Sequence, residues 1–234
     1  MKIALCYWGC IRGFKYDFVR ESHEKYVVNH LKSLGHSVDI FVETYDKEYD
    51  NSVELLKPEH LNILSSDEYD ESLKSDMSRY TMPDYFAPDA KSNLFKCLVS
   101  RKNLSMIIDN SYDVCYTLDI GQEIQNNIDD PKNIESKKLY ISNQSHNQGY
   151  MNRLVSGCVT STKKFGGWID YLTKGEVKYS SNQYQDGRGS GVNLHPEVGM
   201  KIYLNSVGEY PIEDGNLMSC RVKRVRVDGT ILTN

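Results

Sequence analysis

An aspartate at the end of a predicted strand is the first candidate for chemistry. In the segment YDVCYTLDIGQE an apolar run leads into Asp119, and Gly121 follows two residues later. A carboxylate there would lie at the sheet edge where α/β proteins bind ligands, and it suits a divalent cation that bridges two phosphates. Glu123 could assist it. The alternative is that Asp119 only forms a turn, as aspartates commonly do after strands.

Glycine and arginine follow the first predicted strand, in KIALCYWGCIRGFK. Arg12 could form paired hydrogen bonds with a phosphate or carboxylate, and Gly9 and Gly13 would let backbone N–H groups approach the same anion. A surface arginine in a turn would give the same pattern. A second basic pair, Arg101 and Lys102, lies in a predicted helix and is typical of a solvated helix face.

Two later segments carry further polar candidates. The Gly-, Asn- and Gln-rich stretch SNQYQDGRGSGVNLHPE predicts a mobile loop over a site and contains Asp186, His195 and Glu197. Glu197 falls in the first turn of a helix, where the helix dipole favours a charged carboxylate that could act as a general base or simply cap the helix. Asn152 and Arg153 precede a predicted strand and could recognise sugar hydroxyls.

The elements that must position these residues alternate between strands and helices. Residues 2–8 predict a buried strand, 16–34 an amphipathic helix that ends at a glycine, and 36–45 a second strand, which together make a βαβ unit. Later predicted elements are a strand within 61–64, a helix over 92–110, strands from 112, at 139–144 and at 154–160, helices over 161–175 and 194–209, and a half-exposed edge strand over 220–232.

An acidic segment interrupts this alternation. Residues 43–90 hold 13 acidic and 4 basic residues, with Ser, Asn and Pro among them. We interpret 46–90 as a variable, partly looped excursion whose negative charge forms a solvated face, within one domain that spans 1–234. Function is expected at the carboxyl ends of the strands.

Composition excludes several classes of protein. The 234 residues carry a net charge of −4, which does not favour nucleic-acid binding. No apolar run reaches the ~18 residues of a membrane span, and no secretory leader is evident. The 17 tyrosines suit grooves that bind sugars or bases, although ordinary packing explains most of them. The six cysteines lack zinc-site spacing and fit a reducing compartment, so we expect a cytoplasmic protein.

Several segments in order resemble small glycosyltransferases of polysaccharide gene clusters and of large DNA viruses that glycosylate their capsids. The opening strand with a following glycine and arginine, DIFVETY at 39–45, and Lys57-Pro58 match that family's pattern. So do Tyr112-Asp113 before the strand that ends in Asp119, and later the pairs Asn152-Arg153 and Pro196-Glu197. The resemblance spans most of the chain and is weakest in the acidic segment.

This resemblance implies a GT-A-like (Rossmann-like) α/β fold, in which a mixed, mostly parallel central sheet is flanked by helices. Residues 1–125 would bind a UDP- or GDP-linked sugar and 126–234 a glycan or glycoprotein acceptor, in the host cytoplasm if the protein is viral. The cofactor would be Mn²⁺ or Mg²⁺ on Asp119. The expected donor-binding residues are Tyr7, Gly9, Arg12, Tyr45, Arg101 and Asp119. The expected acceptor-binding residues are Asn152, Arg153 and His195, and the candidate bases are Glu197 and Asp186.

The chain departs from the family at one position. Many GT-A enzymes carry a DxD motif, whereas here the strand ends in Thr117-Leu118-Asp119-Ile120-Gly121. One carboxylate can still hold Mg²⁺ together with donor phosphates and water. Two alternatives stay open: a non-catalytic module that binds sugars or nucleotides, and a nucleotidyltransferase-like α/β enzyme.

Overall fold

The structure is a computed structural model of the whole chain. It describes residues 1–11, 13–47, 49–80, 88–133, 138–141, 154–174, 196–213, 222–225 and 229–232. Among the described helices, none combines the length and the apolar character that a bilayer crossing requires.

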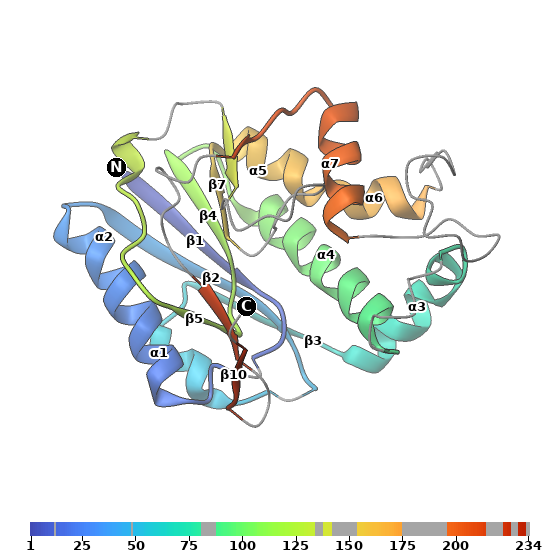
Figure 1. Cartoon of the computed structure of the whole chain (residues 1–234), viewed down its shortest axis with the longest axis horizontal. Coiled ribbons are helices and arrows are strands. Elements are labelled where there is room, and N and C mark those ends of the chain that lie inside the picture. Colours follow the sequence, from blue (N-terminus) through green and yellow to red (C-terminus); the bar gives the residue numbers. More distant parts are fainter. Residues whose placement is uncertain are drawn as a thin grey trace.

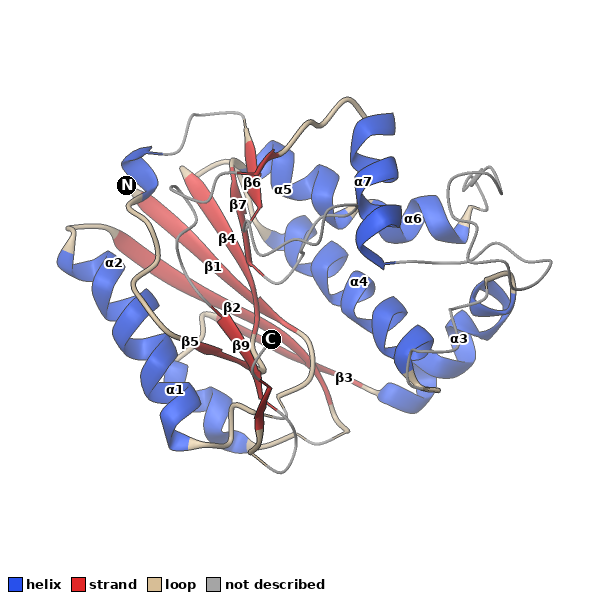
Figure 2. Cartoon of the chain, in the orientation of Figure 1, coloured by secondary structure: helices blue, strands red, loops and turns tan. Residues whose placement is uncertain are grey.

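The centre of the molecule is a seven-stranded, mostly parallel sheet with the order β3-β2-β1-β4-β7-β6-β8 (Figures 1 and 2). Among the strands that the structure describes, β7 alone runs antiparallel to both of its neighbours in this sheet, β4 and β6. The strands are β1 (Lys2–Trp8), β2 (Ser37–Tyr45), β3 (His60–Leu64), β4 (Val114–Asp119), β6 (Leu139–Ile141), β7 (Leu154–Gly157) and β8 (Ile212–Glu213). The expected mixed, mostly parallel sheet is confirmed.

A second, smaller sheet has the order β10-β9-β5. Its strands are β5 (Gln122–Ile124), β9 (Val222–Val225) and β10 (Ile231–Leu232). The prediction of an edge strand near the C-terminus was wrong for β9, because β9 pairs with β5 on one side and β10 on the other. The alternation of valine with basic residues shows that a strand has one polar face, but it does not show how many neighbours the strand has.

Helices cover both faces of the central sheet (Figure 1). On one face lie α1 (Asp17–His23), a π-helical turn (Glu24–Val28) and α2 (Asn29–Ser33), which together confirm the predicted helix over 16–34. On the other face lie α4 (Ala90–Ile107) and α5 (Val159–Gly166). The remaining helices are α3 (Ser66–Ser78), α6 (Trp168–Thr173) and α7 (Pro196–Ser206).

Two predicted elements have different bounds in the structure. The strand expected over 154–160 ends at Gly157, and α5 begins at Val159, so the apolar run is divided between two elements. The helix expected over 161–175 is divided at Gly167 into α5 and α6. Apolar periodicity alone does not separate a short strand from the helix that follows it.

The acidic segment is more ordered than predicted. It contains a 3₁₀ helix (Asn51–Leu56), the expected strand as β3, and α3, which the sequence analysis missed. The apolar stripe of α3 is thin, with Leu73 its one buried apolar residue. The hydroxyl of Ser65 caps the helix by accepting a hydrogen bond from the Glu68 N–H, so the S-x-x-E pattern was the signal that could have revealed α3.

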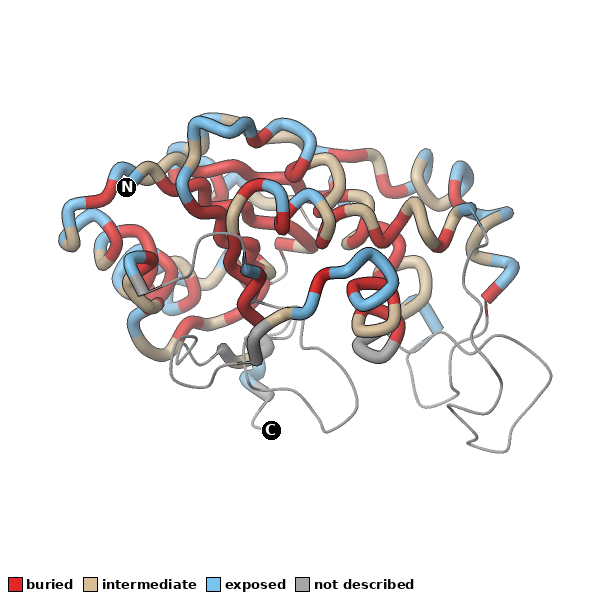
Figure 3. Tube along the Cα trace, turned by 90° about the horizontal axis from the view of Figure 1, so that it is seen from above, coloured by how far each residue is buried: buried red, intermediate tan, exposed pale blue. Residues whose placement is uncertain are grey.

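Alternation along β1 sets which side chains can form a site. Ile3, Leu5 and Tyr7 pack on the α1–α2 side, in one apolar cluster. Ala4, Cys6 and Trp8 pack on the α4–α5 side, in another. Figure 3 shows buried residues mainly in the interior of the molecule and exposed residues mainly on its outer turns. Tyr7 and Trp8, although adjacent in sequence, therefore serve opposite faces.

Candidate functional site

Three neighbouring strands bring their last residues into one row. In the sheet register Trp8 of β1 lies beside Glu43 of β2 on one side and beside Asp119 of β4 on the other. All three belong to the face that packs on α4, since Cys6, Phe41 and Cys115, two or four residues before them, lie in the cluster on that face. The row marks the carboxyl ends of parallel strands, where α/β proteins bind ligands.

Asp119 forms a tight turn and keeps a partly exposed carboxylate. Its Oδ1 accepts a hydrogen bond from the Gly121 N–H at 3.0 Å, and its Oδ2 accepts one from Gln122 Nε2 at 2.8 Å. Gly9 lies beside it with a φ of +100°, and a Cβ added there would be 3.4 Å from Asp119 Oδ1. Gly9 thus allows both a left-handed backbone and a close approach to the carboxylate.

Arg101 of α4 lies over this row, so its assignment to a solvated helix face was wrong. Its guanidinium carbon is 3.7 Å from the centre of the Trp8 ring, and the residue is only 3% exposed. Lys102 does lie on the outer side, where its ammonium pairs with Asp170. Helix α5 packs closely on α4 at this point: a Cβ at Gly166 would be 2.5 Å from Ser105 Oγ and 3.1 Å from the Arg101 carbonyl oxygen.

Buried N–H donors without acceptors gather at this point. Within the described residues, Nε and Nη1 of Arg101 and Nε1 of Trp8 have no hydrogen-bond partner. Burial lowers the pKa of the Arg101 guanidinium to about 10, opposed by Cys97 and Asp119, so the side chain is still charged at neutral pH. A buried cation without a bonded counter-ion is costly, which makes this a place where an anionic or oxygen-rich ligand would be stabilised.

Glu43 is the carboxylate on the other side of Trp8. It is 1% exposed, and it accepts hydrogen bonds from Asn103 Nδ2 at 2.6 Å and Asn62 Nδ2 at 3.4 Å. Burial raises the pKa of Glu43 to about 7, and the two amide hydrogen bonds only partly oppose this effect. Glu43 therefore joins β2, β3 and α4 beneath the site and titrates near neutral pH.

The Glu43→Gln variant is expected to be more stable than the wild type at pH 8. The native pKa of Glu43 lies above its ordinary value of 4.5. Between about pH 4.5 and 7 the native state therefore holds a proton that the unfolded chain has lost. The stability of the wild type therefore falls as the pH rises from about 4.5 to 7 and stays low above that. Glutamine mimics the protonated carboxyl, so it should add about 1–3 kcal/mol at pH 8 and only about a quarter of that at pH 5.

Urea unfolding at pH 5, 6, 7 and 8 measures this difference. Glu71→Gln is the matched control, because the Glu71 side chain is exposed and pairs only with Lys74. The control should shift stability by a few tenths of a kcal/mol at every pH. If Glu43→Gln and wild type gave parallel pH profiles, the raised pKa of Glu43 would be refuted.

Two predicted donor-binding tyrosines lie in the core. Tyr7 is fully buried on the α1–α2 face, with its hydroxyl 3.3 Å from His23 Nδ1. Tyr45 is 1% exposed, and its hydroxyl donates a hydrogen bond to the Lys96 carbonyl oxygen. The structure brings Gly9, Arg101 and Asp119 together and places these two rings elsewhere; their donor roles stay untested.

Other predicted residues lie outside the described part of the chain: Arg12, Asn152, Arg153, Asp186 and His195. Glu197 belongs to α7, but its side chain is not among those described. Their roles as donor ligand, acceptor ligands or bases stay predictions.

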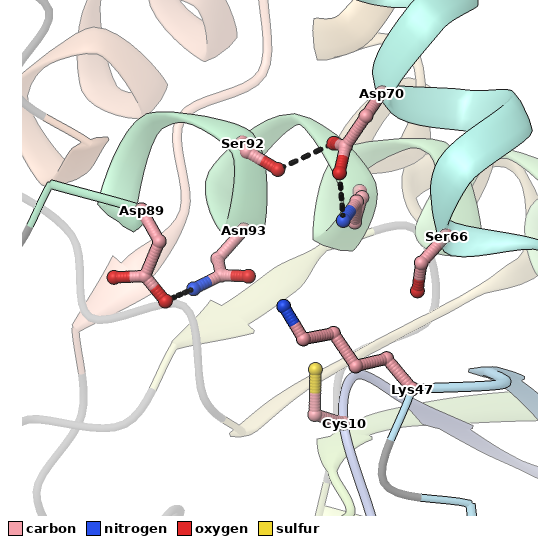
Figure 4. A pocket seen from close by; sticks show the side chains of 8 residues that line it. Cys10, Lys47, Ser66, Asp70, Asp89, Ser92 and Asn93 are labelled. Atoms are coloured by element: carbon pink, nitrogen blue, oxygen red, sulfur yellow. Dashed lines mark hydrogen bonds and ion pairs between the residues drawn. The ribbon is translucent and has the colours of Figure 1, made fainter.

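A cavity next to the site was missed by the sequence analysis. It has a volume of about 320 Å³ and is shown in Figure 4. Its lining comes from the residues just after β1 and β2 and from the start and first two turns of α3 and α4: Cys10, Lys47, Ser66, Asp70, Asp89, Ser92, Asn93 and Lys96. Half of these residues belong to the acidic segment that was interpreted as a solvated excursion.

The described residues fit a divalent metal only in part. Asp119 can supply one hard oxygen ligand, and a Mn²⁺ or Mg²⁺ ion there would need phosphate oxygens and water for the rest. Within the part of the chain that the structure describes, no three His, Cys, Asp or Glu side chains are grouped so as to hold a metal ion. Glu123, the suggested helper, lies on β5 in the small sheet, where it pairs with Lys223.

The chain has no match among models of known protein families, and none among curated proteins. Its function must therefore be inferred from the geometry of the strand ends. Three properties of that geometry matter: a carboxylate in a tight turn, a buried unpaired cation beside it, and a polar cavity next to both.

Proposed function

We propose that this chain is a glycosyltransferase that moves a sugar from a nucleotide-sugar donor to a hydroxyl group of a glycan acceptor. The observation that carries the proposal is the Arg101 guanidinium over Trp8, whose Nε and Nη1 have no partner among the described residues, in the row that ends at Asp119. A diphosphate would bring the negative charge that these N–H groups of Arg101 lack. The mostly parallel sheet is compatible with the GT-A-like domain that the sequence resemblance implies.

The residues have distinct roles in this proposal. Arg101 and the backbone at Gly9 hold the diphosphate, and the charge of Arg101 stabilises the leaving nucleoside diphosphate as the bond to the sugar breaks. Asp119 would hold one side of a Mn²⁺ or Mg²⁺ ion, which when bound supplies Lewis-acid neutralisation of the same charge. If the sugar is transferred with inversion, Glu197 or Asp186 is our candidate base for the acceptor hydroxyl.

A thermal-shift screen of UDP- and GDP-linked sugars, with Mn²⁺ and with EDTA, tests this function. A donor at 100 times its Kd stabilises the native state by about 2.7 kcal/mol, which for a chain of this length is roughly 5–10 °C in melting temperature. Donors that bind are then assayed for sugar release and transfer. If no nucleotide-sugar raised the melting temperature under either condition, the proposal would be wrong.

One observation favours a second candidate, a module that binds the donor without turnover. Both Asp119 oxygens already accept hydrogen bonds from the turn that Asp119 itself forms. Such a module would show the same thermal shifts but no sugar release or transfer. The nucleotidyltransferase alternative predicts instead that nucleoside triphosphates stabilise the protein and nucleotide-sugars do not.

A further inference from the structure

The cavity near the strand ends is lined mainly by polar side chains. Charged and hydroxyl- or amide-bearing side chains from four elements face it, and no aromatic side chain is among its described lining residues (Figure 4). Its volume of about 320 Å³ is at the lower end of the 300–1,000 Å³ that ligand pockets span, so it suits part of a nucleotide-sugar rather than the whole. A ligand group there must form hydrogen bonds in several directions.

Asp70 is the fixed acceptor of the cavity. Its Oδ2 accepts a hydrogen bond from Lys96 Nζ at 2.7 Å and its Oδ1 one from Ser92 Oγ at 2.5 Å. Partial burial raises the pKa of Asp70, but these hydrogen bonds outweigh it and the net pKa is lowered. Each oxygen keeps a further lone-pair direction, because a carboxylate accepts about four hydrogen bonds. Lys96 is 5% exposed, so the pair does not swing freely.

Lys47 is the donor on the opposite wall. Its nitrogen points into the cavity from the end of β2, and no hydrogen bond or ion pair joins it to the other residues drawn in Figure 4. The neighbouring amide of Asn93 is held by Asp89 at 2.8 Å. A carboxylate that accepts and an ammonium that donates, facing one small space, suit adjacent hydroxyl groups better than the flat face of a base.

The cavity adjoins the Asp119 turn through Cys10. Cys10 lines it and directly follows Gly9, and a Cβ at Gly121 would be only 3.1 Å from the Cys10 carbonyl oxygen. The cavity lies toward β2 and β3, whereas β7 lies on the other side of β4. In the proposed function the diphosphate of the donor lies at Arg101 and Asp119, and its sugar faces the acceptor half, residues 126–234. The nucleoside, at the other end of the diphosphate, then lies on the cavity side.

We propose that this cavity binds the ribose of the donor nucleotide, with Asp70 accepting hydrogen bonds from the ribose hydroxyls and Lys47 donating to them. The inference rests on the proposed function, since it names the part of the same donor that enters the cavity. It adds to that function a polar ribose subsite built from the acidic segment.

Removing the ribose hydroxyls and the Asp70 charge together tests the contact. Calorimetry measures the Kd of UDP and GDP, and of their 2′-deoxy and 3′-deoxy analogues, for wild type and Asp70→Asn. Loss of the contacted hydroxyl should weaken binding to wild type about 10- to 100-fold, the effect of one hydrogen bond to a charged group. In Asp70→Asn, removal of the same hydroxyl should weaken binding less than about threefold, because the charged acceptor is gone.

Two further variants complete the experiment. Asp67→Asn is the matched control, because Asp67 is exposed in the first turn of the same helix, and it should keep the wild-type ratio. Lys47→Met changes an exposed side chain without removing the partner of buried Lys96, so it folds even if Asp70→Asn does not. It should weaken UDP or GDP binding about 3- to 10-fold and reduce the preference for the ribose form.

The outcomes separate the two proposals. If nucleotide-sugars bind and turn over but wild type does not distinguish ribose from deoxyribose, the cavity is not the ribose site and the proposed function survives. The same conclusion follows if Asp70→Asn and Lys47→Met keep the wild-type ratio. If neither UDP, GDP nor any nucleotide-sugar binds, the proposed function fails and the ribose subsite fails with it.

Discussion

Asp119→Asn is expected to reduce sugar transfer at least 100-fold and leave the fold intact. Asparagine keeps an oxygen that can accept the Gly121 N–H, and Gln122 can turn its own amide to pair with the new NH₂ group, so the turn survives. The negative charge is lost, and with it the one described carboxylate at this point that could hold a cation against the diphosphate. Loss of one group that acts on transition-state charge commonly costs 10²–10³ in kcat.

The same strand offers a matched control. Asp109 precedes β4 and accepts the Ser111 N–H at 2.8 Å, which is the same two-residue turn at the opposite end of the strand. Asp109→Asn should therefore show the same small change in melting temperature and unchanged transfer. Transfer is measured for both variants with Mn²⁺ and with EDTA. Wild-type transfer by Asp119→Asn would show that Asp119 only forms a turn, and would remove the metal hypothesis.

The framework of the fold could be predicted because its strands and helices have strong local patterns. Lys2–Trp8 and Ser37–Tyr45 are apolar runs with a helix and a glycine between them, and a βαβ unit follows from that order. Gly9 and Asp119 are predicted to lie at one sheet edge for a related reason. This prediction requires only that parallel strands end on the same side.

The packing of the site could not be predicted in the same way. Arg101 and Lys102 are equivalent in a sequence, yet one is buried over Trp8 and the other pairs with Asp170 at the surface. The difference depends on how α5 packs on α4. Gly166 of α5 permits their close approach, and it lies 61 residues or more after the α4 residues that it approaches, Ser105 and Arg101. Apolar periodicity identifies the buried face of a helix from its apolar residues. A buried arginine is therefore assigned to the exposed face by the same pattern.

The acidic segment shows a related limit. Its charge density predicts a solvated face, and for exposed residues such as Asp67 that holds. Asp70 differs because Lys96 and Ser92 of α4 reach it across two elements. A carboxylate with a partner distant in sequence cannot be distinguished from a solvated one by composition alone. The cavity therefore follows only from the relative positions of α3 and α4.

Arg101 carries the second large prediction, because stability and function should change in opposite directions there. Its guanidinium is buried and, among the described residues, unpaired at Nε and Nη1, and it is compensated by the Trp8 ring and by the electrostatic effects of Cys97 and Asp119. Replacing a buried charge by an apolar side chain of similar volume is often neutral or stabilising by 1–4 kcal/mol. The cation–π contact with Trp8 offsets about 0.5–2 kcal/mol of that gain.

Arg101→Met is therefore expected to raise the melting temperature by about 2–8 °C and to weaken nucleotide-sugar binding about 10- to 150-fold, as the loss of a hydrogen-bonded charge on the diphosphate would. Lys102→Met is the matched control, since it removes the same charge from the next position, where the ion pair with Asp170 is exposed, and should change neither quantity appreciably. Differential scanning calorimetry and calorimetric titration with the donor give both readouts. A destabilised Arg101→Met protein that binds donor like wild type would show that Arg101 serves only to pack against Trp8, and would remove the cation from the proposed site.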